Sequence, residues 1–88
     1  MPVVYIPTLM RDLTGGAEKV EVEGATLRQV VNALDARFPG AKARLCREDR
    51  IRPDVAVAVD GEVTRQGMLQ AVTPGSEVHF VPAVSGGN

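Results

Sequence analysis

The sequence contains very few of the residues that build disulfides, metal clusters or aromatic binding surfaces. Cys46 is the only cysteine among 88 residues, which excludes an internal disulfide and a four-thiolate iron–sulfur cluster. Tryptophan is absent, and the aromatic residues are limited to Tyr5, Phe38 and Phe80. The core must therefore consist mainly of valine, leucine and isoleucine. The length predicts one domain with a small core.

An excess of one charge and long apolar runs are also missing. Ten basic and eleven acidic residues are interspersed and give a net charge of −1, which argues against nucleic acid as the main partner. The opening "MPVVYIPTLMRD" lacks the pattern of a secretory signal, and no run reaches the length of a membrane span. We therefore expect a soluble, cytoplasmic protein with no membrane partner.

Strand signals occur on both sides of a central segment. Residues 3–6 are β-branched and aromatic, and residues 18–23 alternate charge with valine, so we expect these two segments to pair as an antiparallel hairpin. Residues 55–59 read "VAVAV", and an Asp-Gly turn returns the chain through residues 62–64. The last strand is predicted over 78–82.

The central segment carries the clearest helix signal. Thr26 and Gln29 have the spacing of a capping box, and apolar residues then recur at helical spacing over residues 27–38. The sequence "FPG" ends this helix, because proline disfavours helical geometry in the residue before it. A charged connection follows over 41–53, with one short helical turn that places Leu45 on the core.

This order of elements predicts an α+β fold, the β-grasp (ubiquitin-like) roll, in which a mixed sheet packs on one main helix. We assign residues 1–83 to this domain and residues 84–88 to a C-terminal tail, expected to be extended or poorly ordered. The alternation of residues predicts a core made of Val4, Ile6, Val20, Val22, Leu27, Val30, Val31, Leu34, Val57 and Val78.

The body of the chain predicts no catalysis. His79 has no Cys, Asp or Glu at metal-ligand spacing, which favours a partly exposed structural histidine. Arginines near Cys46 could lower the pKa of its thiol, but without a partner for catalysis we expect an ordinary semi-buried thiol. The run "CREDR" is interpreted as solvated surface, and "TGGAEK" lacks the spacing of a phosphate-binding loop.

The end of the chain, "PAVSGGN", is more informative. It follows the last strand directly, so its base is anchored while its tip is free. A backbone without side chains can enter a narrow channel and present a terminal carboxylate to an activating enzyme. Beside this tail, Ala56, Ala58, His79 and Val81 are predicted on the sheet face away from the helix. This small-residue, partly apolar patch is a candidate docking surface for such an enzyme.

Nearly the whole chain resembles the small sulfur carriers of the β-grasp type, the MoaD/ThiS type. These include the molybdopterin-synthase small subunit, the thiamin-pathway carrier and, most similar, the mycobacterial-type carriers that work with a cysteine synthase. The matching segments are "IPTLMRDLTGG" at 6–16, "EGATLRQVVNALDARFPG" at 23–40, "VAVDGEV" at 57–63 and "VPAVSGG" at 81–87. The first and last of these segments discriminate best, and the helix discriminates least.

The resemblance implies a protein cosubstrate rather than an enzyme. In that family an activating enzyme of the ubiquitin-activating type uses ATP and Mg²⁺ to adenylate the terminal glycine. Sulfur then replaces the adenylate, and the resulting thiocarboxylate is consumed by a synthase. Carried over here, Gly87 would be the modified residue and Gly86 its slender neighbour. The carrier itself would bind no cofactor and no metal.

Asn88 departs from the family pattern. While it is attached, the Gly87 carbonyl belongs to an amide and cannot be adenylated. One interpretation is a pro-form whose Gly87–Asn88 bond is cleaved by a zinc-dependent peptidase of the JAMM type. The alternatives are that the asparagine is not native or that the protein has lost its carrier function.

Three other functions remain open from the sequence. The chain could be a ubiquitin-like protein modifier joined to lysines through the same glycine, a molybdopterin-synthase small subunit, or a plain interaction domain whose tail has no chemistry. β-Grasp domains host many functions, so the fold alone does not separate them. The acceptor pathway, the sulfur donor and the oligomeric state are not specified by the residues.

Overall fold

The computed structural model describes residues 1–82 and contains short strands, two α-helices and two 3₁₀ helices. In chain order the elements are β1 (Val3–Tyr5), a 3₁₀ helix (Thr8–Met10), β2 (Lys19–Glu21), α1 (Leu27–Arg37), α2 (Ala41–Leu45), β3 (Cys46–Arg47), β4 (Arg50–Ile51), β5 (Val55–Val59), β6 (Glu62–Val63), a second 3₁₀ helix (Gly67–Leu69) and β7 (Glu77–Pro82).

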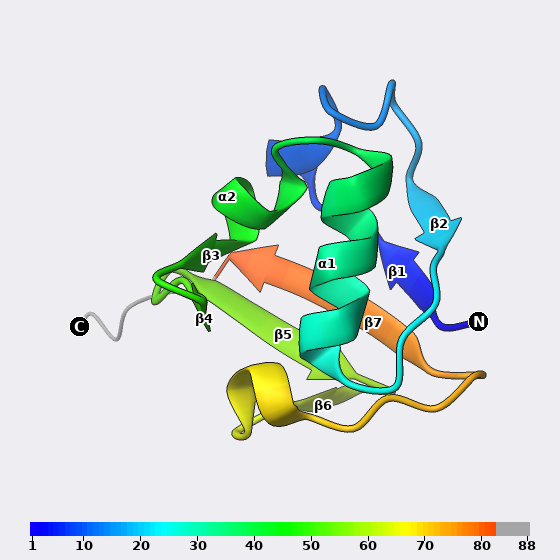
Figure 1. Ribbon diagram of the computed structural model, residues 1–88, viewed down its shortest axis with the longest axis vertical. Coiled ribbons are helices and arrows are strands. Elements are labelled where there is room, and N and C mark those ends of the chain that lie inside the picture. The colour runs from blue at the N-terminus through cyan, green and yellow to red at the C-terminus, as the bar shows by residue number, and fades with distance from the viewer. Residues whose placement is uncertain (83–88) are drawn as a thin grey trace.

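Five strands form one mixed sheet in the order β2-β1-β7-β5-β6, which Figure 1 shows behind α1. The first and last strands are parallel neighbours, with Val4 opposite Val78, whereas all other pairs are antiparallel. Val4 also lies opposite Val20 of β2. The N-terminal and C-terminal strands therefore occupy the centre of the sheet, which confirms the predicted α+β, β-grasp topology.

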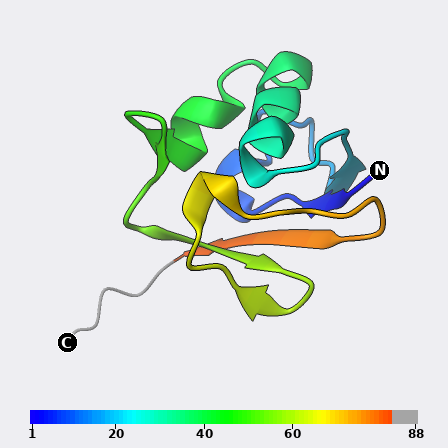
Figure 2. The same ribbon diagram turned by 60° about the horizontal axis from the view of Figure 1, so that its bottom comes forward.

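Both α-helices lie on one face of the sheet, as Figure 2 shows, and the core fills the space between. All ten residues predicted for the core are buried, including Leu34 on α1 at 0% exposure. The two 3₁₀ helices also contribute to the core, because Met10 and Met68 are buried. Within residues 1–82, no helix has the length and apolar character needed to cross a membrane.

The ends of α1 follow the sequence signals. The Thr26 hydroxyl accepts a hydrogen bond from the Gln29 amide at 3.3 Å, and the Gln29 side chain accepts one from the Ala25 amide at 2.8 Å. The return bond thus reaches Ala25, one residue earlier than in the usual capping box. At the other end, Gly40 takes a φ of 101°, a left-handed conformation that glycine adopts without strain.

Three features differ from the sequence prediction. The first two strands pair antiparallel as expected, but the connection between them is long and contains a 3₁₀ helix. Met10 of this helix is fully buried and anchors the connection in the core. Within the charged connection, α2 places Leu45 in the core as predicted, but a small hairpin of β3 and β4 follows it. The second 3₁₀ helix was not predicted either.

Candidate functional site

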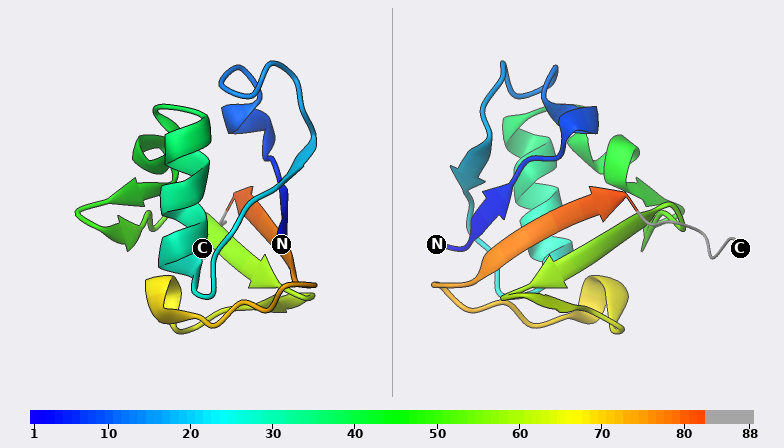
Figure 3. Two further views of the ribbon diagram at one scale, coloured as in Figure 1. Left: turned by 45° about the vertical axis from the view of Figure 1, so that its right-hand side comes forward. Right: turned by 180° about the vertical axis from the view of Figure 1, so that it is seen from behind.

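The tail residues singled out by the sequence, Gly86, Gly87 and Asn88, lie outside the described residues, as does the proposed domain boundary after residue 83. The structure does place the base of the tail. Pro82, the last residue of β7, lies opposite Val55, the first residue of β5. In the right-hand view of Figure 3, this end of β7 lies at the edge of the molecule, far from the N-terminus.

The four predicted docking residues lie together on the sheet face away from the helices. In β5, the buried residues Val55, Val57 and Val59 alternate with the half-buried Ala56 and Ala58. The register places Ala56 opposite Val81 and Ala58 opposite His79 across β5 and β7. Their predicted position is therefore confirmed, and their role in docking stays a prediction.

Two further residues extend this surface. The rings of Tyr5 and His79 stack with centroids 4.1 Å apart, across the parallel pair of β1 and β7. On the other side, Val63 of β6 lies opposite Ala58 and is 64% exposed. We call the six residues Tyr5, Ala56, Ala58, Val63, His79 and Val81 the outer-face patch. Strand alternation is the signal that could have placed Tyr5 and Val63 on this face, because Val4, beside Tyr5 in β1, points into the core.

Cys46 is buried rather than semi-buried, with 8% of its surface exposed. Burial raises the pKa of its thiol, and the nearby positive charges of Lys42 and Arg28 oppose this with smaller effects. The guanidinium of Arg44, one of the arginines that the sequence places nearby, instead contacts the Leu9 carbonyl at 2.6 Å and the carboxylate of Asp12. The thiol is therefore held in its unreactive, protonated form, which agrees with the structural interpretation.

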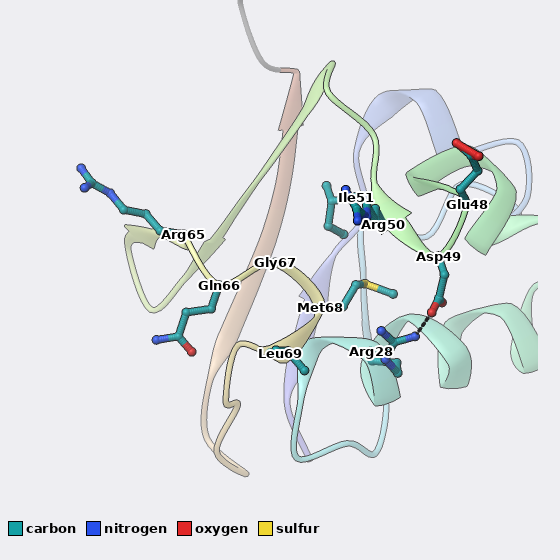
Figure 4. A pocket seen from close by; sticks show the side chains of 10 residues that line it. All are labelled: Arg28, Glu48, Asp49, Arg50, Ile51, Arg65, Gln66, Gly67, Met68 and Leu69. Atoms are coloured by element: carbon teal, nitrogen blue, oxygen red, sulfur yellow. Dashed lines mark hydrogen bonds and ion pairs between the residues drawn. The ribbon is translucent and has the colours of Figure 1, made fainter.

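A hollow of about 510 Å³ lies between the β3–β4 hairpin, the second 3₁₀ helix and the start of α1 (Figure 4). An ion pair joins Arg28 to Asp49 across it. In Figure 4, Arg65 and Gln66 point away from the hollow, whereas Met68 points toward Ile51. The lining combines the Arg28–Asp49 ion pair and the charged residues Glu48, Arg50 and Arg65 with apolar residues such as Ile51 and Met68, and it contains no histidine, cysteine or serine that could serve as a nucleophile or base.

Within the part of the chain that the structure describes, no three His, Cys, Asp or Glu side chains form a group that could hold a metal ion. His79 instead uses its ring to stack on Tyr5. The charged side chains of the described residues instead form exposed ion pairs, such as those of Arg44 with Asp12 and Arg52 with Asp54.

Comparison with known proteins agrees with this description. Residues 4–87 match the ThiS family. The chain is 35% identical to the sulfur carrier protein CysO of Mycobacterium tuberculosis over 89 aligned residues, covering 96% of both proteins. It is also 33% identical to small archaeal modifier protein 3 of Haloferax volcanii over 67 aligned residues, covering 74% of this chain and 73% of that protein.

A solved structure shows the same similarity in three dimensions. The BexX/CysO complex of Amycolatopsis orientalis contains a chain that superposes with a TM-score of 0.90 at 36% identity. The match covers 99% of this chain and 100% of that one. Full-length agreement in sequence, topology and core leads to one assignment: the chain belongs to the ThiS family and is a CysO-like sulfur carrier of the β-grasp fold.

Proposed function

We propose that this carrier transports sulfur as a thiocarboxylate on the terminal carboxylate of Gly87. The observation that carries the proposal is the extent of the family match, which ends at Gly87 and leaves Asn88 outside. The match thus contains both tail glycines. The described body supplies a docking surface without catalytic groups, as suits a protein on which other proteins act.

The chemistry proceeds in two steps on an activating enzyme of the ubiquitin-activating type. The Gly87 carboxylate attacks the α-phosphorus of ATP, whose phosphates are held by Mg²⁺ on that enzyme, and pyrophosphate leaves. A reduced sulfur nucleophile then attacks the carbonyl carbon of the acyl adenylate, and AMP leaves with the bonding electron pair. The carrier contributes its tail and its docking surface, and it binds no cofactor of its own.

Asn88 must be removed before this chemistry, because an amide carbonyl offers no carboxylate to ATP. We assign this step to a zinc-dependent peptidase of the JAMM type, which hydrolyses the Gly87–Asn88 bond. A water molecule adds across the bond, so Gly87 gains a free carboxylate and asparagine is released. Glycine on the acyl side leaves space for the peptidase to approach this bond.

The sulfur is passed on to a synthase, and the similarity to CysO favours a cysteine synthase-like acceptor and cysteine as the product. The Amycolatopsis orientalis relative forms a complex with BexX, which supports a protein partner for this fold. We place the docking of these partners on the outer-face patch, because it is exposed and continuous with the strand that leads into the tail.

A second candidate function is protein modification through the same glycine. The similarity to small archaeal modifier protein 3 favours it. Both functions begin with adenylation, so they differ only in what attacks the adenylate. The carrier requires a sulfur nucleophile, whereas the modifier requires the amine of a target lysine.

Mass spectrometry of the protein isolated from its own cells tests the proposal. We expect loss of Asn88 together with a mass gain that matches replacement of one carboxylate oxygen by sulfur. Removal of a cysteine synthase-like acceptor should raise the thiocarboxylate fraction. Gly-Gly remnants on lysines of other proteins, with no thiocarboxylate in any growth condition, would instead establish the modifier and refute the carrier.

A further inference from the structure

The β3–β4 hairpin carries two like charges in direct opposition. Arg47 of β3 lies opposite Arg50 of β4 in the register. Both side chains are exposed, and neither forms an ion pair with any residue in the range 1–82. Like charges placed directly across two strands destabilise the pairing, so this hairpin contains a local repulsion, although the charge of Arg47 also helps to lower the pKa of the nearby Asp54.

The turn of the same hairpin holds a second unfavourable choice. Glu48 and Asp49 take φ values of 52° and 62°, in the left-handed region that glycine and asparagine adopt more readily. Asp49 is held in this conformation by ion pairs with Arg28 of α1 and with Lys42 of α2, the latter at 3.4 Å. The turn of the hairpin is thus joined to both helices, while the two arginine side chains remain exposed.

The hairpin also lies where the domain leads into the tail. Five residues after Arg50 comes the start of β5, where Val55 lies opposite Pro82 at the end of β7. Figure 1 shows β3 and β4 at the same end of the molecule as the end of β7, and Figure 2 shows them on the side of the sheet that the helices cover. A protein that receives the tail approaches this end of the molecule, where Arg47 and Arg50 are exposed.

We propose that Arg47 and Arg50 bind a carboxylate group on the surface of the protein that activates the tail. This inference rests on the proposed function, since it requires that an activating enzyme receives the tail. A carboxylate between two guanidinium groups accepts charge-assisted hydrogen bonds from both. Its negative charge attracts each guanidinium and so offsets the repulsion between the two. Local features that destabilise a free protein are expected where a partner relieves them.

A pair of positive charges at the base of the tail would also act before contact. Complementary charge mainly accelerates and orients association, and it changes the chemical step little. Loss of these positive charges should therefore raise the KM for the carrier and leave kcat and the KM for ATP unchanged. It also weakens as salt is added, because salt screens exposed charges.

The test measures pyrophosphate release by the activating enzyme of the same genome, with carrier chains that end at Gly87. Arg47→Glu and Arg50→Glu are compared with the parent chain. We expect the KM for the carrier to rise at least about tenfold in low salt, as lost electrostatic attraction predicts. The difference should shrink as salt is raised, and kcat should remain that of the parent.

A matched control separates this surface from the overall charge. Arg11→Glu makes the same change from arginine to glutamate at the end of the first 3₁₀ helix, outside the outer-face patch, where the arginine side chain forms no ion pair within residues 1–82. We expect its KM to equal that of the parent. Equal effects of Arg11→Glu and Arg47→Glu would refute a specific site, and so would an unchanged KM in both the Arg47 and the Arg50 variants.

The double variant Arg47→Ala/Arg50→Ala distinguishes binding from a structural role. Removing the repulsion should leave the protein at least as stable toward heat as the parent, while the KM for the carrier rises. A loss of stability with an unchanged KM for the carrier would overturn the proposal. A change confined to the KM for ATP would also overturn it, because it would show that the arginines affect nucleotide binding. If the parent chain itself releases no pyrophosphate, the proposed function fails first, and this inference falls with it.

Discussion

The ring of His79 stacks on the ring of Tyr5 with 19° between their planes, which joins the two central strands on the face that no described helix covers. The stack lies beside the small side chain of Ala58 and in the strand that ends at Pro82. The outer-face patch is therefore continuous with the strand that ends at Pro82. This continuity supports our proposal that partner proteins dock there.

Val81→Asp tests the docking role of the outer-face patch. Val81 is 42% exposed, so the substitution should leave the fold intact while a charge disrupts the partly apolar contact with the activating enzyme. Binding measured by calorimetry should weaken strongly. Leu9→Asp is the matched control, since Leu9 is similarly exposed at 39% but lies in the first 3₁₀ helix, outside the patch. Unchanged binding of Val81→Asp would place recognition elsewhere.

Leu34→Ala tests the packing of α1. Leu34 is fully buried on the helix, so its truncation should lower the free energy of unfolding by about 2–5 kcal/mol if the cavity stays open. Chemical denaturation measured by circular dichroism provides this value. A loss of only a few tenths would contradict the position of Leu34 in the core.

Gly24→Ala tests a close approach between the loop before α1 and the helix itself. A Cβ at Gly24 would lie 2.8 Å from both the Cγ2 atom and the backbone nitrogen of Val30. The backbone must shift to accept it, so we expect a loss of about 1–3 kcal/mol, typical of overpacking. Gly75→Ala is the control, because a Cβ there meets nothing within 4 Å. Equal stability of the two variants would contradict the close packing.

The buried thiol of Cys46 gives stability a dependence on pH. Burial raises its pKa, so the unfolded chain loses the thiol proton at a lower pH than the folded chain. The folded state then binds more protons above the ordinary thiol pKa, and stability should fall as pH rises through that range.

Thermal unfolding at increasing pH measures this decline, and Cys46→Ala should remove the part due to the thiol. In the folded protein, alkylation of Cys46 by iodoacetamide should be slow until denaturant is added. Fast alkylation of the native protein at neutral pH would show that the thiol is neither buried nor protonated.

The regular part of the fold was predictable because local patterns and global packing agree. Alternation in "VAVAV" predicts the face of every residue in β5, and Thr26 with Gln29 predicts the start of α1. The β3–β4 hairpin was not predictable in this way. Its turn is Glu48-Asp49, without glycine or asparagine, and it is held by ion pairs from two helices, one of which, α1, is distant in sequence.

In the candidate site too, local patterns predict some features and miss others. Strand alternation was enough to place Ala56, Ala58, His79 and Val81 on one face. The stacking of Tyr5 on His79 required knowing that the first and last strands are parallel neighbours, a non-local pairing that no local pattern encodes. Met10 and Met68 of the core lie in short 3₁₀ helices between the regular elements, where the periodicity of strands and α-helices gives no signal.

Adenylation of the tail tests the central claim most directly. Pyrophosphate release is measured with the cognate activating enzyme and ATP for three chains: one ending at Gly87, the full chain ending at Asn88, and Gly87→Ala ending at residue 87. We expect release with the first chain, none with the second, and an impaired rate with the third despite an intact fold. Equal rates for the chains ending at Gly87 and at Asn88 would contradict the account, because then the Gly87 carboxylate is not the group that is activated.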